Sequence, residues 1–239
     1  MSGPPVLSLQ GVSKRYRAGG HVVQALDETF LDFQAGEVTG IVGPSGSGKT
    51  TLLMVAGLIE PPTTGSVLLD GTDMSGAASD MRALAACRLR HFGFVFQKPN
   101  LVPFLDAIEN VEVAMHVAGV PMDVARRRAL ALMEQMNVAH RAHSMPNQMS
   151  GGEQQRVAIC RSLANRPRVL LADEPTASLD SERARQVMDL FSSLARNEGV
   201  GVITVTHDLR WTDFFDQVVE MRDGRIVVRW AGRREPQPL

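Results

Sequence analysis

The chain has 239 residues, 44% of them hydrophobic, and its 25 basic and 26 acidic side chains give a formal net charge of −1. This apolar content suits one packed domain rather than a disordered chain, and the near-zero charge argues against a nucleic-acid partner, which would need an excess of Lys and Arg. No segment approaches the roughly 18 consecutive apolar residues of a membrane-spanning helix, so we expect a cytoplasmic chain.

The first third of the chain predicts short antiparallel strands. Apolar runs separated by turns cover residues 6–9, 21–26, 29–33 and 67–69. A further strand over residues 37–42 runs into a glycine-rich turn and then into a helical segment over residues 49–58. The sequence therefore predicts an antiparallel β region around one strand–loop–helix unit.

The remainder predicts a helical lobe and then an alternation of helices and strands. Apolar positions recur at helical spacing over residues 107–117 and 124–136, with arginines on the opposite faces. From residue 151 the pattern becomes helix, strand (169–172), helix (182–196) and strand (200–206), which is typical of a parallel sheet covered by helices. A hairpin over residues 218–228 turns at Asp223-Gly224.

The glycine-rich turn has the pattern of a phosphate-binding loop. It reads Gly43-Pro44-Ser45-Gly46-Ser47-Gly48-Lys49-Thr50 and lies between a predicted strand and a predicted helix, as that motif requires. Glycines let successive N–H groups turn towards a polyphosphate, the helix start adds its positive end, and Lys49 adds a charge. Thr50 offers a hydroxyl to Mg²⁺. The alternative is a flexible Gly-Ser turn.

A pair of carboxylates ends the strand at residues 169–172. Asp173 and Glu174 would lie at the carboxyl end of a parallel strand, where open α/β sheets bind ligands. Asp173 can hold Mg²⁺, and Glu174 can orient the water that attacks a γ-phosphate or accept a proton from it. A lone Asp-Glu pair would more often cap the next helix, but here it follows a phosphate loop.

A second glycine-rich helix start precedes the carboxylates. Ser150-Gly151-Gly152-Glu153-Gln154-Gln155-Arg156 resembles the signature of the ATP-binding cassette (ABC) family, and its hydroxyl and amides could meet an anion. As a string alone it could also be an ordinary helix cap. The resemblance extends over about residues 6–228. It implies a P-loop NTPase core with a parallel sheet, an antiparallel β subdomain and a helical subdomain.

The resemblance also implies a domain plan and a dimer. Residues 1–239 would be a single ABC ATPase domain, in which about 6–80 and 151–228 form the RecA-like core with the antiparallel β subdomain. About 81–149 would form the helical sub-lobe and 229–239 a tail. In this family two subunits pack head to tail, so that the phosphate loop of each faces the signature of the other across a bound ATP.

Further family positions occur here in the expected order. Tyr16 matches the aromatic residue that stacks on adenine, Gln97 the glutamine that reaches Mg²⁺ and the attacking water, and His207 the histidine that bonds to the γ-phosphate. Taken alone, these would be rim, surface and capping residues. Residues 177–180 match the loop that communicates across the dimer.

The resemblance thus implies a complete set of site residues for two cofactors, ATP and Mg²⁺. The catalytic residues are Glu174, His207 and Gln97, and the metal ligands are Thr50, Gln97 and Asp173. The nucleotide-binding residues are Tyr16, Gly43, Pro44, Ser45, Gly46, Ser47, Gly48, Lys49, Thr50, Thr51, Ser150, Gly151, Gly152, Glu153 and Asp180.

Within the family, residues 90–97, 101–103 and 109–111 resemble the branch for lipoprotein release and macrolide export. That branch implies an ATPase at the cytoplasmic face of the inner membrane, held there by a separately encoded permease. We expect a groove lined by residues 99–104 and by the apolar face of 108–117 to receive the permease, unless these residues fill the core of the lobe.

Other roles within the family stay open. A regulator of a permease-like partner, for division or signalling, would have the same motifs without transporting a substrate. DNA-repair members contain a long coiled coil and ribosome-acting members a second cassette, and neither feature occurs in this sequence.

Overall fold

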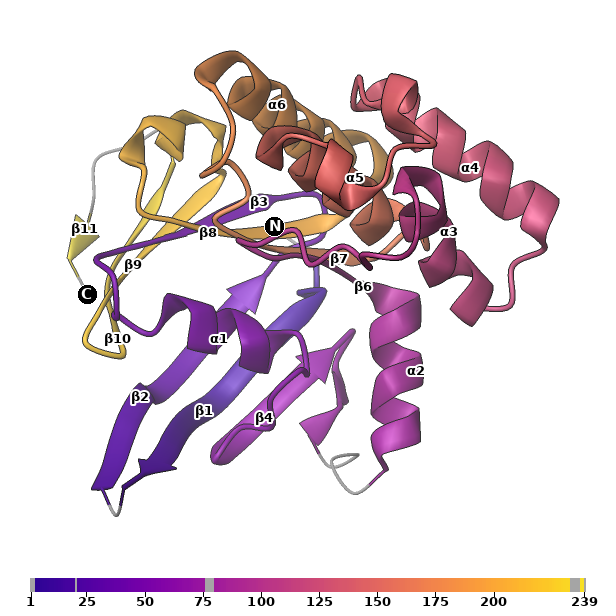
Figure 1. The fold of residues 1–239 in the computed structure, drawn as a ribbon. Helices are drawn as coiled ribbons and strands as arrows, with labels where there is room; N and C mark the ends of the chain where they lie inside the picture. The colour runs from indigo at the N-terminus through magenta and orange to yellow at the C-terminus, as the bar shows by residue number, and fades with distance from the viewer. Residues whose placement is uncertain (1–2, 20, 76–79, 233–236, 239) are drawn as a thin grey trace.

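The computed structural model describes residues 3–19, 21–75, 80–232 and 237–238. Its described residues form a four-stranded antiparallel sheet in the order β2-β1-β4-β5 (Figure 1). These strands are β1 (Leu7–Ala18), β2 (His21–Phe33), β4 (Thr64–Leu69) and β5 (Thr72–Asp73). The predicted antiparallel β region is therefore confirmed.

Strand β2 is continuous where the sequence predicted two strands. The polar pair Asp27-Glu28 suggested a break, but the pairing of β2 with β1 continues past it through register shifts between Val12 and Arg15. Such irregularities let a strand absorb extra residues without ending.

The second sheet has seven strands in the order β11-β10-β9-β3-β8-β7-β6. Strands β9, β3, β8, β7 and β6 run parallel, and β10 and β11 are antiparallel additions at one edge. The bounds are β3 (Val38–Val42), β6 (Phe92–Val95), β7 (Val169–Asp173), β8 (Gly201–Thr206), β9 (Gln217–Arg222), β10 (Arg225–Ala231) and β11 (Gln237–Pro238). Strand β6 comes from the stretch expected to be helical, and residues 233–236 and 239 of the expected tail lie outside the described residues.

Helices cover both faces of this larger sheet (Figure 1). Helix α1 lies between the two sheets, and α5 and α6 lie on the opposite face together with α3 and α4. None of the helices described is both long and apolar enough to cross a membrane. The bounds are α1 (Lys49–Ala56), α2 (Met81–His91), α3 (Ala107–Val117), α4 (Met122–Gln135), α5 (Gly151–Leu163) and α6 (Ser181–Glu198), with short 3-10 helices η2 (Ala139–Arg141), η3 (Pro146–Gln148) and η4 (Leu209–Phe214).

Strand β7 shows how the sequence serves both faces. Its residues are all buried, and they alternate between two cores: Val169 and Leu171 pack with α1, whereas Leu170 and Ala172 pack on the side of α5 and α6. A strand buried on both sides has to be apolar throughout. This explains the uninterrupted apolar run ahead of Asp173.

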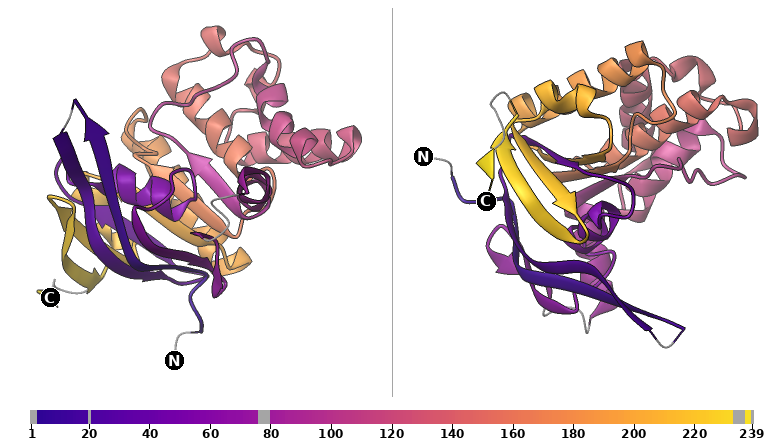
Figure 2. Two further views of the ribbon diagram at one scale, coloured as in Figure 1. Left: turned by 90° about the horizontal axis from the view of Figure 1, so that it is seen from below. Right: turned by 90° about the vertical axis from the view of Figure 1, so that its left-hand side faces the viewer.

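The two sheets meet beside the β9–β10 hairpin. Figure 2 shows this hairpin next to β2, and the N–H of Asp27 donates to the carbonyl of Gly224 in its turn at 2.9 Å. The predicted turn at Asp223-Gly224 is confirmed.

Parallel pairing brings the functional segments to one end of the sheet. The carboxyl ends of β3, β8, β7 and β6 are neighbours, because Val42 pairs with Thr206, Asp173 with Val205 and Val95 with Ala172. Loops that leave this end are where α/β sheets bind ligands. The glycine-rich loop, both carboxylates, Gln97 and His207 all follow these strand ends.

Candidate nucleotide-binding and hydrolysis site

The glycine-rich loop connects β3 to α1, and two of its glycines are sterically required. Gly43 has φ 147°, and a Cβ there would lie 2.1 Å from the carbonyl oxygen of Met221. Gly48 has φ 95°, and its Cβ would lie 2.5 Å from the carbonyl oxygen of Ala25. Any larger residue would displace the backbone of a neighbouring segment. The loop is thus packed against two strands at fixed points, which holds its N–H groups in place.

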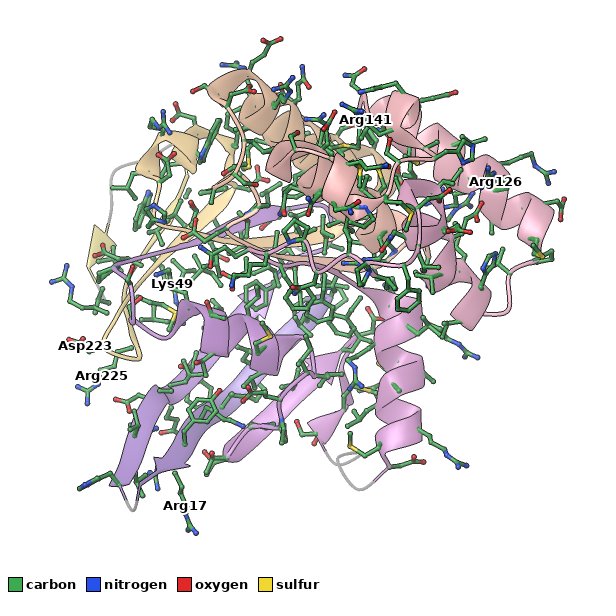
Figure 3. All side chains as sticks on the ribbon, in the orientation of Figure 1. Arg17, Lys49, Arg126, Arg141, Asp223 and Arg225 are labelled. Carbon is green, nitrogen blue, oxygen red and sulfur yellow. The ribbon has the colours of Figure 1, made fainter. Side chains whose placement is uncertain are left out.

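Lys49 turns back into this loop from the first position of α1 (Figure 3). Its Nζ donates to the carbonyl oxygens of Gly43 at 2.8 Å and Pro44 at 2.7 Å, and the side chain is buried. Burial lowers the pKa of Lys49, and the charges of Glu174 and Asp173 partly offset this. Because its hydrogen-bond partners are neutral oxygens, the ammonium can exchange them for the oxygens of an anion in the loop.

Asp173, at the end of β7, contacts Thr50 in the first turn of α1. The Thr50 hydroxyl donates to Asp173 Oδ2 at 3.0 Å. Burial raises the pKa of Asp173, whereas the bond from Thr50 lowers it. A hydroxyl beside a carboxylate suits Mg²⁺, which takes one or two carboxylates together with phosphate oxygens. The described residues hold no group of three or more His, Cys, Asp or Glu side chains that could bind a metal alone. Phosphate oxygens and water would complete the coordination of a Mg²⁺ held here.

Glu174 has a strained backbone that aims its carboxylate at the end of β8. Its φ is +47°, in the left-handed region that non-glycine residues rarely adopt. The bond from its N–H to the carbonyl of Val205, at 2.9 Å, holds this conformation. Oε1 accepts from the His207 backbone N–H at 3.0 Å and lies 2.7 Å from His207 Nδ1, and Oε2 accepts from the Thr206 hydroxyl at 3.3 Å.

The pairing with Glu174 determines what His207 can offer to a ligand. If Nδ1 donates to the carboxylate, Nε2 is the ring nitrogen left to face a phosphate. It can donate there only if the ring carries both protons, which makes it a cation held by Glu174. The sequence prediction placed His207 near Glu174 but could not show that they are bonded.

Gln97 lies two residues beyond the end of β6, with an exposed side chain. Since Val95 pairs with Ala172, continuing that register brings Gln97 level with Glu174 at the same end of the sheet. The start of its loop is tied to the signature helix, because Gln155 Nε2 donates to the carbonyl of Phe96 at 3.1 Å. The backbone just before Gln97 is therefore linked directly to α5.

Tyr16 belongs to a small charged cluster beside α1. Its hydroxyl donates to Glu60 at 2.6 Å, and the Lys14 ammonium lies 3.1 Å from Glu60 and 5.1 Å from the Tyr16 ring centroid. Burial raises the pKa of Tyr16, the bond to Glu60 raises it further, and a bond with the predicted nucleotide-binding residue Thr51 lowers it. These contacts fix the Tyr16 ring beside the start of α1, with the Lys14 ammonium over one of its faces. Stacking on a base would use an exposed face of the ring.

The signature forms a capped helix start away from the phosphate loop. Ser150 is the N-cap of α5 and forms a capping box with Glu153. A Cβ on Gly152 would lie 3.3 Å from Leu179, so the signature contacts the 177–180 loop of its own subunit. Asp180 of that loop caps α6 by accepting from the Arg183 N–H at 2.9 Å. Within the described residues, no hydrogen bond or ion pair joins the signature to the phosphate loop.

The expected groove is largely absent. Ile108, Val111 and Met115 are at most 1% exposed and belong to the core, because α3 packs on α4 and α5 through this face. The alternative, that these residues fill the lobe, is therefore correct for these three residues, whereas Val117 at the end of α3 is 69% exposed. Phe104 remains as a prominent apolar residue, 76% exposed.

Sequence reasoning missed two partners of the site residues, and it missed the burial of Arg156 within the signature. Arg141 in η2 donates to Glu153 of the signature at 2.8 Å, and Glu60 holds Tyr16. Arg156 in α5 is 5% exposed, and its Nε has no hydrogen-bond partner in the described structure. No local pattern indicates the roles of Arg141 and Glu60, since each depends on a contact between separate elements.

Comparison with known proteins places this geometry in a family. The family model described as ABC transporter matches residues 26–177, more than half of the chain. The chain belongs to the ABC transporter family. The LolD ATP-binding protein of the lipoprotein-releasing system of Hyphomonas neptunium is 42% identical over 223 residues, covering 93% of this chain and 97% of LolD. The macrolide export ATP-binding/permease protein MacB of Brucella melitensis is 44% identical over 227 residues, covering 95% of this chain and 35% of MacB.

A solved structure gives the same result. The ATP-binding cassette MJ0796, in a dimeric post-hydrolysis state bound to ADP and phosphate, superposes with a TM-score of 0.90 at 37% identity and covers 96% of this chain and 100% of its own. These findings confirm the predicted ABC ATPase fold and an ATPase activity coupled to transport. The resemblance to the lipoprotein-release and macrolide-export branch is confirmed as well.

Proposed function

We propose that this ABC ATPase works as one domain in a head-to-tail pair that energises lipoprotein release or export through a separate permease at the cytoplasmic face of the inner membrane. The proposal rests on two glycine-rich helix starts in one chain, at Gly48 and Ser150, between which the described residues show no hydrogen bond. A single triphosphate cannot use both within one subunit, whereas a two-fold pair completes two sites at once. The dimeric state of MJ0796 with ADP and phosphate supports this arrangement.

In the proposed cycle the residues of one subunit bind and position the nucleotide. Tyr16 stacks on adenine, the loop amides and Lys49 bind the phosphates, and Thr50, Asp173 and Gln97 hold Mg²⁺, which when bound neutralises phosphate charge. Glu174 orients the attacking water and accepts its proton. His207 keeps Glu174 in place through the 2.7 Å contact and presents Nε2 to the γ-phosphate.

We propose Phe104 as the docking point for a cytoplasmic segment of the permease. The Asn110 side chain accepts from the Val102 N–H at 2.7 Å and donates to the carbonyl of Leu105 at 2.9 Å, which fixes the loop so that Phe104 projects outward. MacB, which contains a permease in the same chain, and LolD, part of a releasing system, support a membrane partner. A large apolar residue exposed on a rigid loop is typical of a protein interface.

Two measurements test this docking point. The first is capture of a permease by the ATPase from detergent-solubilised membranes, and the second is the ATPase rate after the captured permease is added back. We expect the wild type to retain a polytopic permease whose addition changes its ATPase rate, and Phe104→Glu to lose both effects while keeping its own ATP hydrolysis. Met122→Glu, at an equally exposed apolar residue of the same lobe, is the matched control and should behave as wild type. Equal capture by the Phe104 variant would rule out this surface. A separate assay distinguishes transport from regulation. If the ATPase and its permease release a lipoprotein or a drug from vesicles when ATP is added, the complex is a transporter; a complex that hydrolyses ATP without releasing either would be a regulator.

A further inference from the structure

Ser150 and Glu153 close a hydrogen-bonded ring at the start of α5. The Ser150 backbone N–H and hydroxyl both donate to Glu153 Oε2 at 2.8 Å, and the Glu153 N–H donates back to Ser150 Oγ at 3.3 Å. One carboxylate oxygen therefore takes two bonds from a single residue. This satisfies helix-start donors that would otherwise lack partners.

The ring poses a problem for binding an anion at this helix start. A serine hydroxyl has one proton, and here it is donated to a carboxylate. For Ser150 to donate to a phosphate it must rotate that proton away from Glu153, while the negative carboxylate beside it repels the incoming charge. The helix dipole favours an anion, but Glu153 opposes it at the same point.

The structure supplies an opposing charge from another element. Arg141 Nε donates to Glu153 Oε1 at 2.8 Å, and His140 Nε2 lies 3.5 Å from the same oxygen. Glu153 is 13% exposed and Arg141 39% exposed, so solvent screens this pair only in part. Hydrogen bonds from Arg141 and Ser150 lower the pKa of Glu153 to about 2, and the bond from Arg141 is the largest cause.

The position of Arg141 is fixed by the backbone of η2 (Figure 3). Its N–H donates to the carbonyl of Val138 at 3.0 Å, and its own carbonyl accepts from the Ser144 N–H at 2.8 Å. The guanidinium thus comes from a braced turn that follows α4, outside the signature itself.

We propose that Arg141 is a positioning residue that neutralises Glu153, so that Ser150 can turn its hydroxyl to the γ-phosphate of a nucleotide bound by a second copy of this chain. The inference rests on the proposed head-to-tail dimer. Arg141 would thereby belong to the site that the phosphate loop of one subunit and the signature of the other form together. It would act through Glu153, without touching the nucleotide.

A charge-compensation cycle in the Glu174→Gln background tests the proposal. Dimer formation is measured against protein concentration at saturating Mg-ATP by analytical ultracentrifugation, for Arg141→Met, Glu153→Gln and the two combined. We expect Arg141→Met to raise the midpoint concentration by about tenfold, because it leaves a carboxylate unpaired beside the phosphate. The double variant should return to within about twofold of the parent, since a neutral amide needs no counter-charge and still caps the helix.

Controls separate this role from loss of structure. Arg127→Met removes an equal charge from α4, where Arg127 pairs with Asp123 at 2.9 Å, and should leave the midpoint unchanged. Arg141→Lys should retain most of the parent's affinity, and binding of a fluorescent ATP analogue to single subunits should be the same in all variants. An Arg141→Met midpoint equal to the parent's, or a double variant as weak as Arg141→Met, would overturn the proposal. A parent that stays single with ATP would instead contradict the proposed dimer, and the inference with it.

Discussion

The ionisable residues of the site differ in whether the fold favours their charged or their neutral form. Glu153 is held by three donors from Ser150 and Arg141, which depress its pKa to about 2. Lys49 and Asp173 are shifted the opposite way, each towards its neutral form, and burial is the main cause for both. The fold thus stabilises the charge of the signature carboxylate, whereas burial disfavours the charged forms of Lys49 and Asp173.

The low pKa of Glu153 predicts acid sensitivity. Because the folded pKa lies below the ordinary value of 4.5, the carboxylate stabilises the fold above pH 4.5, and this contribution is lost as the pH falls towards about 2. Glu153→Gln, which keeps the cap, should flatten the pH dependence of the free energy of unfolding across this window by an amount on the order of 1 kcal/mol after solvent screening. Urea unfolding at a series of pH values measures it, and parallel profiles for the two proteins would contradict it.

At the scale of elements, short polar side chains at the N-cap determine where helices begin. Asp106 serves as the N-cap of α3 in a capping box with Glu109. Its side chain accepts a backbone N–H that would otherwise lack a partner at the helix start. The beginning of α3 is therefore set by these two acidic residues.

Asn110 is the element-scale residue whose loss we expect to be costly. It is fully buried, and its amide bonds to the backbone of Val102, Leu105 and Asp106. Asn110→Ala should lower the free energy of unfolding by about 2 to 3 kcal/mol, because several buried backbone groups lose their partners. Urea unfolding tests this, with His116→Ala at an exposed position of α3 as the control. A loss of less than about 0.5 kcal/mol would mean that water or the loop replaces these bonds.

The sequence predicted the elements that carry their own periodicity and turn signals. The strand before the phosphate loop, helices α3 and α4, and the hairpin at Asp223-Gly224 were all foreseen. Strand β6 was missed because three apolar residues and a glycine next to a helix give too short a pattern. The exposure of α3 was wrong, since an apolar helix face does not show whether its partner is another helix of the same lobe or a second protein.

At the scale of the whole molecule, the site depends on pairing between segments far apart in sequence. Local patterns gave the motifs, but the neighbour order β9-β3-β8-β7-β6 is set by packing of both sheet faces. That order brings Thr50 to Asp173 and Glu174 to His207. The contact from Arg141 to Glu153 could not be predicted, because it joins a 3-10 turn to a helix with no shared periodicity.

Within the described part of one subunit, no hydrogen bond or ion pair joins the signature to the phosphate loop. A nucleotide bound in that loop would therefore not reach the signature of the same subunit. In the proposed head-to-tail pair a second copy would supply the phosphate, and the nucleotide would become part of the interface, so that its hydrolysis would remove contacts that hold the pair together. The stability of the pair should therefore depend on an intact triphosphate.

The most direct measurement is the mass in solution of the Glu174→Gln variant with and without Mg-ATP. Replacing the carboxylate by an amide removes the proton acceptor while leaving the loop, Lys49 and the signature in place. We predict single subunits without nucleotide or with ADP, and a stable dimer holding two ATP molecules with Mg-ATP, by analytical ultracentrifugation and nucleotide quantification. A variant that binds ATP yet stays a single subunit at every accessible concentration would contradict the account.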